Sequence, residues 1–77
     1  MDKIIVLTSN IGIDSVGRIV NTLRRGKVKL KEIKMNFEDN LVKIYIKLSG
    51  EENEIDWLSK KLNRLVDVEE IKVLENG

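Results

Sequence analysis

The chain has 77 residues, 42% of them apolar and 35% charged, and its 14 Lys and Arg against 13 Asp and Glu give a formal net charge of +1. This balance excludes a strongly basic nucleic-acid-binding tail and an acidic disordered segment. Because the sequence contains neither cysteine nor histidine, it excludes disulfides, thiolate metal sites and the commonest acid–base side chain. The length fits one small domain spanning residues 1–77.

Nothing in the sequence predicts a membrane or export signal. No apolar run approaches the roughly 18 residues of a membrane span. The first residues also lack the long apolar stretch and the small-residue cleavage site of a signal peptide. We therefore expect a cytoplasmic protein with no membrane contact.

The first predicted element is a strand over residues 3–8, which is apolar on both faces. One face holds Ile4 and Val6, and the other holds Ile5 and Leu7. A strand of this kind is usually central in its sheet.

A helix is predicted over residues 15–25, with Asp14 as its N-cap and Gly26 ending it in a left-handed conformation. Its apolar stripe consists of Val16, Ile19, Val20 and Leu23. A strand over residues 28–37 follows, and its apolar alternation changes phase, which requires a bulge near Lys31 and Glu32.

The second half begins with a turn at residues 38–40 and a strand at 41–48. Residues 49–52 match a capping box, which opens a second helix that runs to about Leu65. A last strand is predicted over residues 67–74, with a phase slip between Val68 and Ile71.

The order β-α-β-β-α-β predicts a ferredoxin-like α+β sandwich, in which two helices cover one face of a four-stranded antiparallel sheet. The other sheet face has nothing in the chain to cover it. We expect Ile5, Leu7 and Tyr45 to point there, and an uncovered apolar face or edge invites a partner.

The motifs bear on two possible functions, RNA binding and catalysis. Residues 24–31 are the densest basic stretch, and RNA-recognition domains of this fold stack bases on two or three sheet aromatics. The central strands offer only Tyr45, so RNA binding is an alternative and nucleic acid is not the expected partner.

Adjacent carboxylates such as Glu51 and Glu52 point apart, and we predict no catalytic residue, metal site or cofactor.

Three segments carry a family resemblance. The run Leu62–Val68 (LNRLVDV) resembles the L-x-K-L-V-D-V run of acetohydroxyacid (acetolactate) synthase small subunits. Residues 15–20 resemble the L-x-R-V helix of that family, and Arg25-Gly26 followed by residues 28–30 resembles its R-G-Y/F-x-I/V segment. The resemblance covers nearly the whole chain.

The resemblance implies an ACT domain in a regulatory subunit of the short, single-domain type. Such a subunit is not an enzyme; it binds and activates a catalytic subunit that uses thiamine diphosphate, Mg²⁺ and FAD in branched-chain amino-acid biosynthesis. The alternative is an amino-acid-sensing or interaction-only ACT protein that serves another enzyme.

The resemblance also implies an amino-acid effector site between two protomers, at the first β–α loop and the start of the second strand. The candidate effector-binding residues are Asn10, Ile11, Gly12, Ile13, Asp14 and Lys29. The loop Asn and Gly of valine-sensitive members fall on Ile11 and Asp14, and their strand Asn falls on Lys29. Because Asp14 places a negative charge where a ligand carboxylate would lie, we expect weak valine binding or none.

We expect a homodimer or a higher homo-oligomer, because a domain of this size is marginal alone. The predicted interface residues are Val28, Leu30 and Tyr45. The resemblance implies that the strand at 28–37 joins its copy edge to edge, as in ACT-domain dimers.

Overall fold

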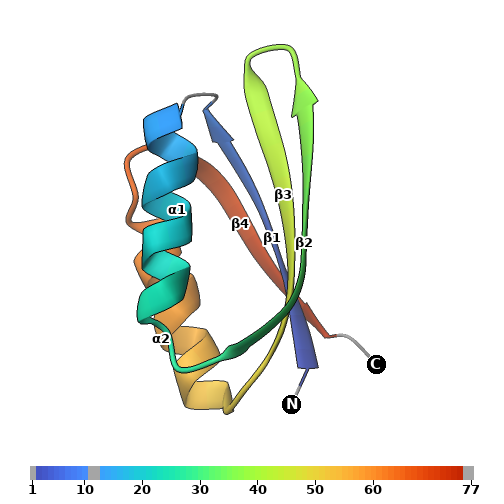
Figure 1. Cartoon of the computed structure of the whole chain (residues 1–77), viewed down its shortest axis with the longest axis vertical. Coiled ribbons are helices and arrows are strands. Elements are labelled where there is room, and N and C mark those ends of the chain that lie inside the picture. The colour runs from blue at the N-terminus through green and yellow to red at the C-terminus, as the bar shows by residue number, and fades with distance from the viewer. Residues whose placement is uncertain (1, 11–12, 76–77) are drawn as a thin grey trace.

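The computed structural model describes residues 2–10 and 13–75, which form a layer of two helices against one face of a four-stranded sheet (Figure 1). The elements are β1 (Asp2–Asn10), α1 (Ile13–Arg25), β2 (Lys29–Glu38), β3 (Leu41–Ser49), α2 (Glu52–Asn63) and β4 (Val68–Glu75). The strand order is β2-β3-β1-β4, and every neighbouring pair is antiparallel. The predicted ferredoxin-like sandwich is confirmed.

The irregularities predicted in the two edge strands are confirmed as well. The register of β2 against β3 shifts between Leu30 and Glu32, so Lys31 is the extra residue of a bulge. The register of β4 against β1 shifts between Val68 and Glu70. The turn between β2 and β3 contains Asp39, whose φ of 50° is left-handed and suits a tight turn.

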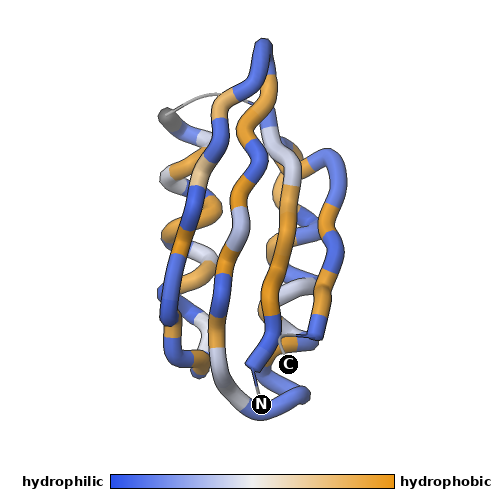
Figure 2. Tube along the Cα trace, turned by 90° about the vertical axis from the view of Figure 1, so that its right-hand side faces the viewer, coloured by the Kyte–Doolittle hydropathy of each residue, from blue (hydrophilic) through white to orange (hydrophobic). Residues whose placement is uncertain are grey.

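The core lies between the sheet and the helices, and it corrects one prediction about β1. Its buried apolar residues are Ile5, Leu7, Ile19, Leu23, Val42, Ile44, Ile46, Leu48, Ile55, Leu58 and Leu62. Ile5 and Leu7 were expected on the uncovered face, which is wrong, because they pair with Ile46 and Ile44 of β3 and share their covered face. Figure 2 shows why alternation could not decide this, since the middle of β1 is an unbroken hydrophobic stretch from Ile4 to Leu7.

The capping predicted at both ends of the first helix is wrong, although its predicted last residue, Arg25, is confirmed. The helix begins at Ile13, so Asp14 lies in its first turn and is not the N-cap. No described glycine has a positive φ, so Gly26 does not end the helix in a left-handed conformation. A Cβ at Gly26 would lie 3.2 Å from the methyl carbons of Leu58, so glycine here permits close approach of the two helices.

The capping box predicted for the second helix is also wrong. Ser49 belongs to β3, and Glu51 occupies the N-cap position of α2 without a side-chain capping hydrogen bond. The inward stripe is confirmed, since Ile55, Leu58 and Leu62 are buried. Among the described residues, neither helix has the length and apolar content needed to cross a membrane.

Candidate functional site

The predicted effector residues of the first β–α loop lie at one end of the molecule. Asn10 ends β1 and is exposed, Asp14 is exposed in the first turn of α1, and Ile13 begins that helix. Ile11 and Gly12 lie outside the described residues. The structure therefore places the two polar members of the predicted site at the surface beside the start of α1.

Lys29 lies at the opposite end of the sheet from this loop. Lys29 pairs with Ser49, whereas Asn10 pairs with Leu41 at the other end of β3. The eight residues that separate these rows along β3 span roughly 26 Å at the usual strand rise. Within one chain the structure does not bring Lys29 to the loop, so a shared site needs Lys29 from another copy.

A hydrogen-bonded network holds the end of β1 against α1 and the segment before β4. The side chain of Arg18 donates to one carboxylate oxygen of Asp67 through two nitrogens, each at 2.7 Å. The carbonyl of Asp67 accepts from the amide of Asn10 at 3.0 Å and from the hydroxyl of Ser9 at 3.1 Å. Sequence reasoning missed this network, although Arg18 and Asp67 stand in two of the segments that carry the resemblance.

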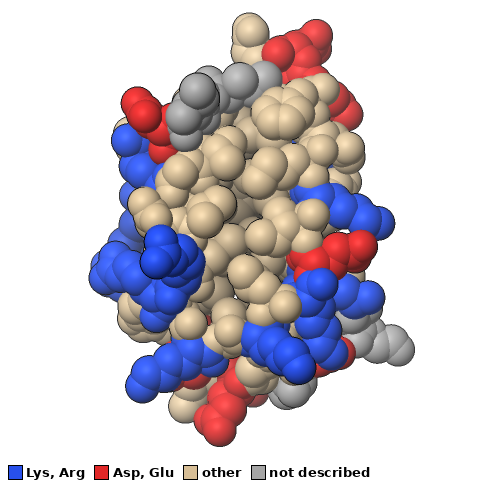
Figure 3. All heavy atoms as spheres, in the orientation of Figure 1, with Lys and Arg blue, Asp and Glu red and all other residues tan. Residues whose placement is uncertain are grey.

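An apolar groove runs between α1 and β2, and we call it the α1–β2 groove. Its exposed members are Val20, Leu30, Ile33 and Phe37, with exposed fractions of 38%, 42%, 39% and 63%. Figure 3 shows this side of the molecule as an uncharged patch between the helix and the strand, with lysine and arginine side chains around its lower half.

The three predicted interface residues do not share one surface. Leu30 pairs with the buried Leu48, so it points to the helix side of the sheet and borders the α1–β2 groove. Val28 is half-buried and packs against the core, close to Gly50. Tyr45 points to the open face, as predicted, where it lies between Val6 and Lys34.

The open face is more polar than the sequence predicted. It holds Ile4, Val6 and Leu74 together with a set of lysines, namely Lys34, Lys43, Lys47 and Lys72. The error follows from β1, because the residues expected there, Ile5 and Leu7, are in the core. Lysine stems cover apolar surface while their ammonium groups stay in water, so this face is solvated without a partner.

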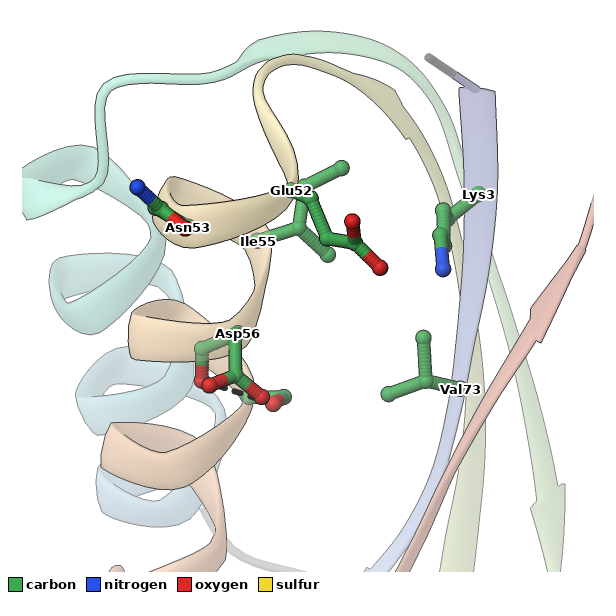
Figure 4. Close-up of a pocket in the computed structure, with 7 residues that line it drawn as sticks. Lys3, Glu52, Asn53, Ile55, Asp56 and Val73 are labelled. Carbon is green, nitrogen blue, oxygen red and sulfur yellow. Dashed lines mark hydrogen bonds between the residues drawn. The ribbon is translucent and has the colours of Figure 1, made fainter.

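A cavity of about 490 Å³ lies between the first turns of α2 and the C-terminal half of β4 (Figure 4). The side chain of Lys3 enters it from β1 and is only 13% exposed, and its ammonium forms an ion pair with Glu75 at 2.9 Å. This hydrogen-bonded carboxylate raises the pKa of Lys3, and the charges of Glu52 and Asp56 act in the same direction. Val73 supplies an apolar wall.

Among the described residues, no group of three or more Asp or Glu side chains could hold a metal ion. Besides Lys3, the pKa of Asp2 is shifted; it is lowered by hydrogen bonds from Lys31 and Ser49. Both shifts arise from ion pairs between strands.

Comparison with known proteins supports the assignment of the fold. A family model described as the ACT domain matches residues 13–71. The crystal structure of the ACT domain from GTP pyrophosphokinase of Chlorobium tepidum superimposes with a TM-score of 0.86 at 13% identity, covering 96% of this chain and 97% of that one. A search of curated proteins finds no matching sequence.

A second solved structure is also similar. The C-terminal domain of the MgtC protein from Mycobacterium tuberculosis superimposes with a TM-score of 0.77 at 9% identity, covering 94% of this chain and 83% of that one. At these identities the likeness concerns the fold alone.

Proposed function

Since the chain belongs to the ACT domain family, a family of small-molecule-binding regulatory domains, we propose that it is a non-catalytic regulatory subunit of acetohydroxyacid synthase. In this role it binds and activates the catalytic subunit of that enzyme, in branched-chain amino-acid biosynthesis. It acts as a homodimer or larger homo-oligomer and supplies no cofactor of its own.

The observation that carries this proposal is the ion pair between Arg18 and Asp67. Both residues occupy the charged positions of segments that resemble the small subunits, and the segments meet in space although 49 residues separate them. The network then fixes Asn10, the last residue before the loop that would receive an effector. A regulatory role needs only binding energy that favours one state of the larger protein.

The test is to mix the protein with the acetohydroxyacid synthase catalytic subunit of the same organism. We expect a complex on a sizing column and a higher rate of acetolactate formation. Valine at millimolar concentration is expected to leave that rate unchanged, because Asp14 lies exposed in the first turn of α1. Tight valine binding in calorimetry would contradict the alignment of the loop.

Two surface variants locate the contact with the catalytic subunit. Phe37→Asp places a charge in the α1–β2 groove, and Tyr45→Asp places one on the open face. Both positions lie outside the buried core, so the fold should survive either change. The proposal would be overturned if the wild-type protein neither formed a complex with the catalytic subunit nor changed its rate of acetolactate formation.

A second candidate is an ACT protein that serves a different enzyme. The similar ACT domain of GTP pyrophosphokinase favours this alternative, because it places the same fold in another enzyme. Purifying the tagged protein from its own organism separates the two, since the enzyme that accompanies it at stoichiometric yield is the partner.

A further inference from the structure

The two long sides of the molecule carry opposite charge. Residues 13–38, which form α1 and β2, contain seven Lys and Arg against three Asp and Glu. Residues 51–75, which form α2 and β4, contain four Lys and Arg against eight Asp and Glu. Figure 2 shows that these two segments lie toward opposite edges of the molecule, with β2 at one edge of the sheet and β4 at the other. Two copies placed side by side in the same orientation would attract each other.

Among the described residues, each edge strand has a neighbour on one side only, and the strand directions allow the sheet to continue. β2 runs parallel to β1, whereas β4 runs antiparallel to it, because each neighbouring pair is antiparallel. The β2 edge of one copy therefore meets the β4 edge of the next as an antiparallel pair. This is the pairing that edge strands form most readily.

The apolar residues of the two edges lie on the same side of such a continued sheet. Ile33 of β2 and Val73 of β4 belong to one row that crosses Ile46 and Ile5, and all four point to the helix layer. Ile33 is 39% exposed and Val73 is 41% exposed. Joining the edges would therefore cover apolar surface at both ends of each row.

The open-face charges of the edges also match. Glu32 and Lys34 lie 3.8 Å apart on β2, and Glu70 and Lys72 lie 3.5 Å apart on β4. With Lys34 opposite Glu70 of the next copy, Glu32 falls opposite its Lys72, and the four charges alternate around a square. Cross-strand pairs of opposite charge stabilise the pairing of two strands.

We propose that copies of this chain associate head to tail, with the β2 edge of one copy continuing the sheet at the β4 edge of the next. A two-fold pairing of β2 with β2 would bring two basic sides together and leave the β4 edge and Val73 uncovered. The head-to-tail contact is heterologous, so it repeats and produces a closed ring or an open chain of copies. This inference concerns the chain itself and holds whichever enzyme it serves.

The chain lacks cysteine, so single cysteines can report the pairing. In the register that places Lys34 opposite Glu70, Ile33 lies opposite Ile71 of the next copy. We would mix Ile33→Cys with a tagged Ile71→Cys variant, oxidise the mixture gently and separate the disulfides by mass. The expected result is a mixed disulfide in large excess over both symmetric ones. The control is Ile33→Cys mixed with Asn21→Cys, because Asn21 is exposed on α1. Its yield of mixed disulfide measures how often cysteines meet by random collision.

Charge variants provide a second, independent measurement by light scattering at several protein concentrations. Lys34→Glu should lower the average mass, and Lys34→Glu combined with Glu70→Lys should restore it, because the cross-strand pair at positions 34 and 70 then has opposite charges again. A predominant Ile33–Ile33 disulfide, a closed dimer that does not grow with concentration, or a failure of Glu70→Lys to restore the mass would each overturn the proposal. A monomer at millimolar concentration would overturn it as well, whereas a failure to activate acetohydroxyacid synthase would count only against the proposed function.

Discussion

Strands β2 and β3 lie side by side, and apolar and polar residues alternate along both. The apolar residues that face the helices are buried on β3, whereas most of those on β2 are exposed. The inward residues of β3, which are Val42, Ile44, Ile46 and Leu48, are all 0% exposed. Their row partners on β2 point to the same side, yet Ile33 is 39% exposed and Phe37 is 63% exposed. The exposure of Ile33 and Phe37 shows that the helix layer does not cover this edge strand as it covers β3. Alternation therefore decides which face a side chain joins, and the position of the strand decides whether that face is covered.

The sharpest test of this comparison uses two isoleucines of one row. Ile46→Ala should lower the free energy of unfolding by about 3–4 kcal/mol, because it removes a fully buried side chain and leaves a cavity. Ile33→Ala should cost about 1 kcal/mol, because the side chain keeps its contact with water. Urea unfolding of both variants at low protein concentration measures the difference.

The same pair tests the proposed association. If Ile33 becomes buried between copies, the cost of Ile33→Ala should grow with protein concentration, whereas that of Ile46→Ala should stay constant. Equal costs for the two variants in dilute solution would mean that β2 is already covered within the monomer.

A smaller effect is expected from the polar residue on the covered side of β1. Ser9 is 0% exposed, and its hydroxyl donates to the carbonyls of Asn10 and Asp67. Ser9→Ala should cost about 1 kcal/mol, because a buried hydrogen bond is lost. Thr8→Ala, at the neighbouring half-buried position on the open face, is the matched control and should cost less. Thermal unfolding of the two variants compares them, and a larger loss for Thr8→Ala would contradict this account of the network.

Two glycines extend the comparison to the helices. A Cβ at Gly17 would meet nothing within 4 Å, so Gly17→Ala should stabilise the protein by about 0.5–1 kcal/mol through helix propensity. A Cβ at Gly26 would press on Leu58, which is fully buried, so Gly26→Ala should not stabilise the protein. Chemical denaturation decides the sign of each change, and a stabilising Gly26→Ala would show that the helix contact yields easily.

The smallest effect concerns Lys3, a charged residue on the covered side at the corner of the sheet. The hydrogen bond to Glu75 raises the pKa of Lys3 above its ordinary 10.5, so the ion pair contributes its full stability below that pH. The contribution is lost as the pH rises through the raised pKa. The stability of the wild type relative to Lys3→Met should therefore stay constant up to about pH 10 and fall as the pH rises above 10.5, as measured by urea midpoints over that range.

Glu75→Gln is the matched variant for this experiment, because it removes the carboxylate that raises the pKa of Lys3. Its stability relative to Lys3→Met should change less with pH than that of the wild type. An identical pH dependence in both would show that another group is responsible.

Much of the candidate site was out of reach of sequence reasoning for a physical reason. The loop residues Asn10 and Asp14 were predicted from the resemblance, and the structure keeps them at one end of the molecule because they are neighbours in the chain. Lys29 was added from the resemblance, and the register of β2 places it at the far end. The contact between Arg18 and Asp67 depends on how α1 packs beside the segment before β4, which no local pattern encodes.

The sequence by itself determined the order of the elements, the bulge at Lys31 and the slip between Val68 and Ile71, because alternation and helical spacing are local properties of the chain. It left open which face of β1 is covered, since Ile4 to Leu7 are apolar on both sides. Only the tertiary structure decided that, through the pairing of β1 with β3. It also decided that the apolar side of β2 stays largely open to water, because β2 is an edge strand and the helix layer leaves Ile33 and Phe37 exposed.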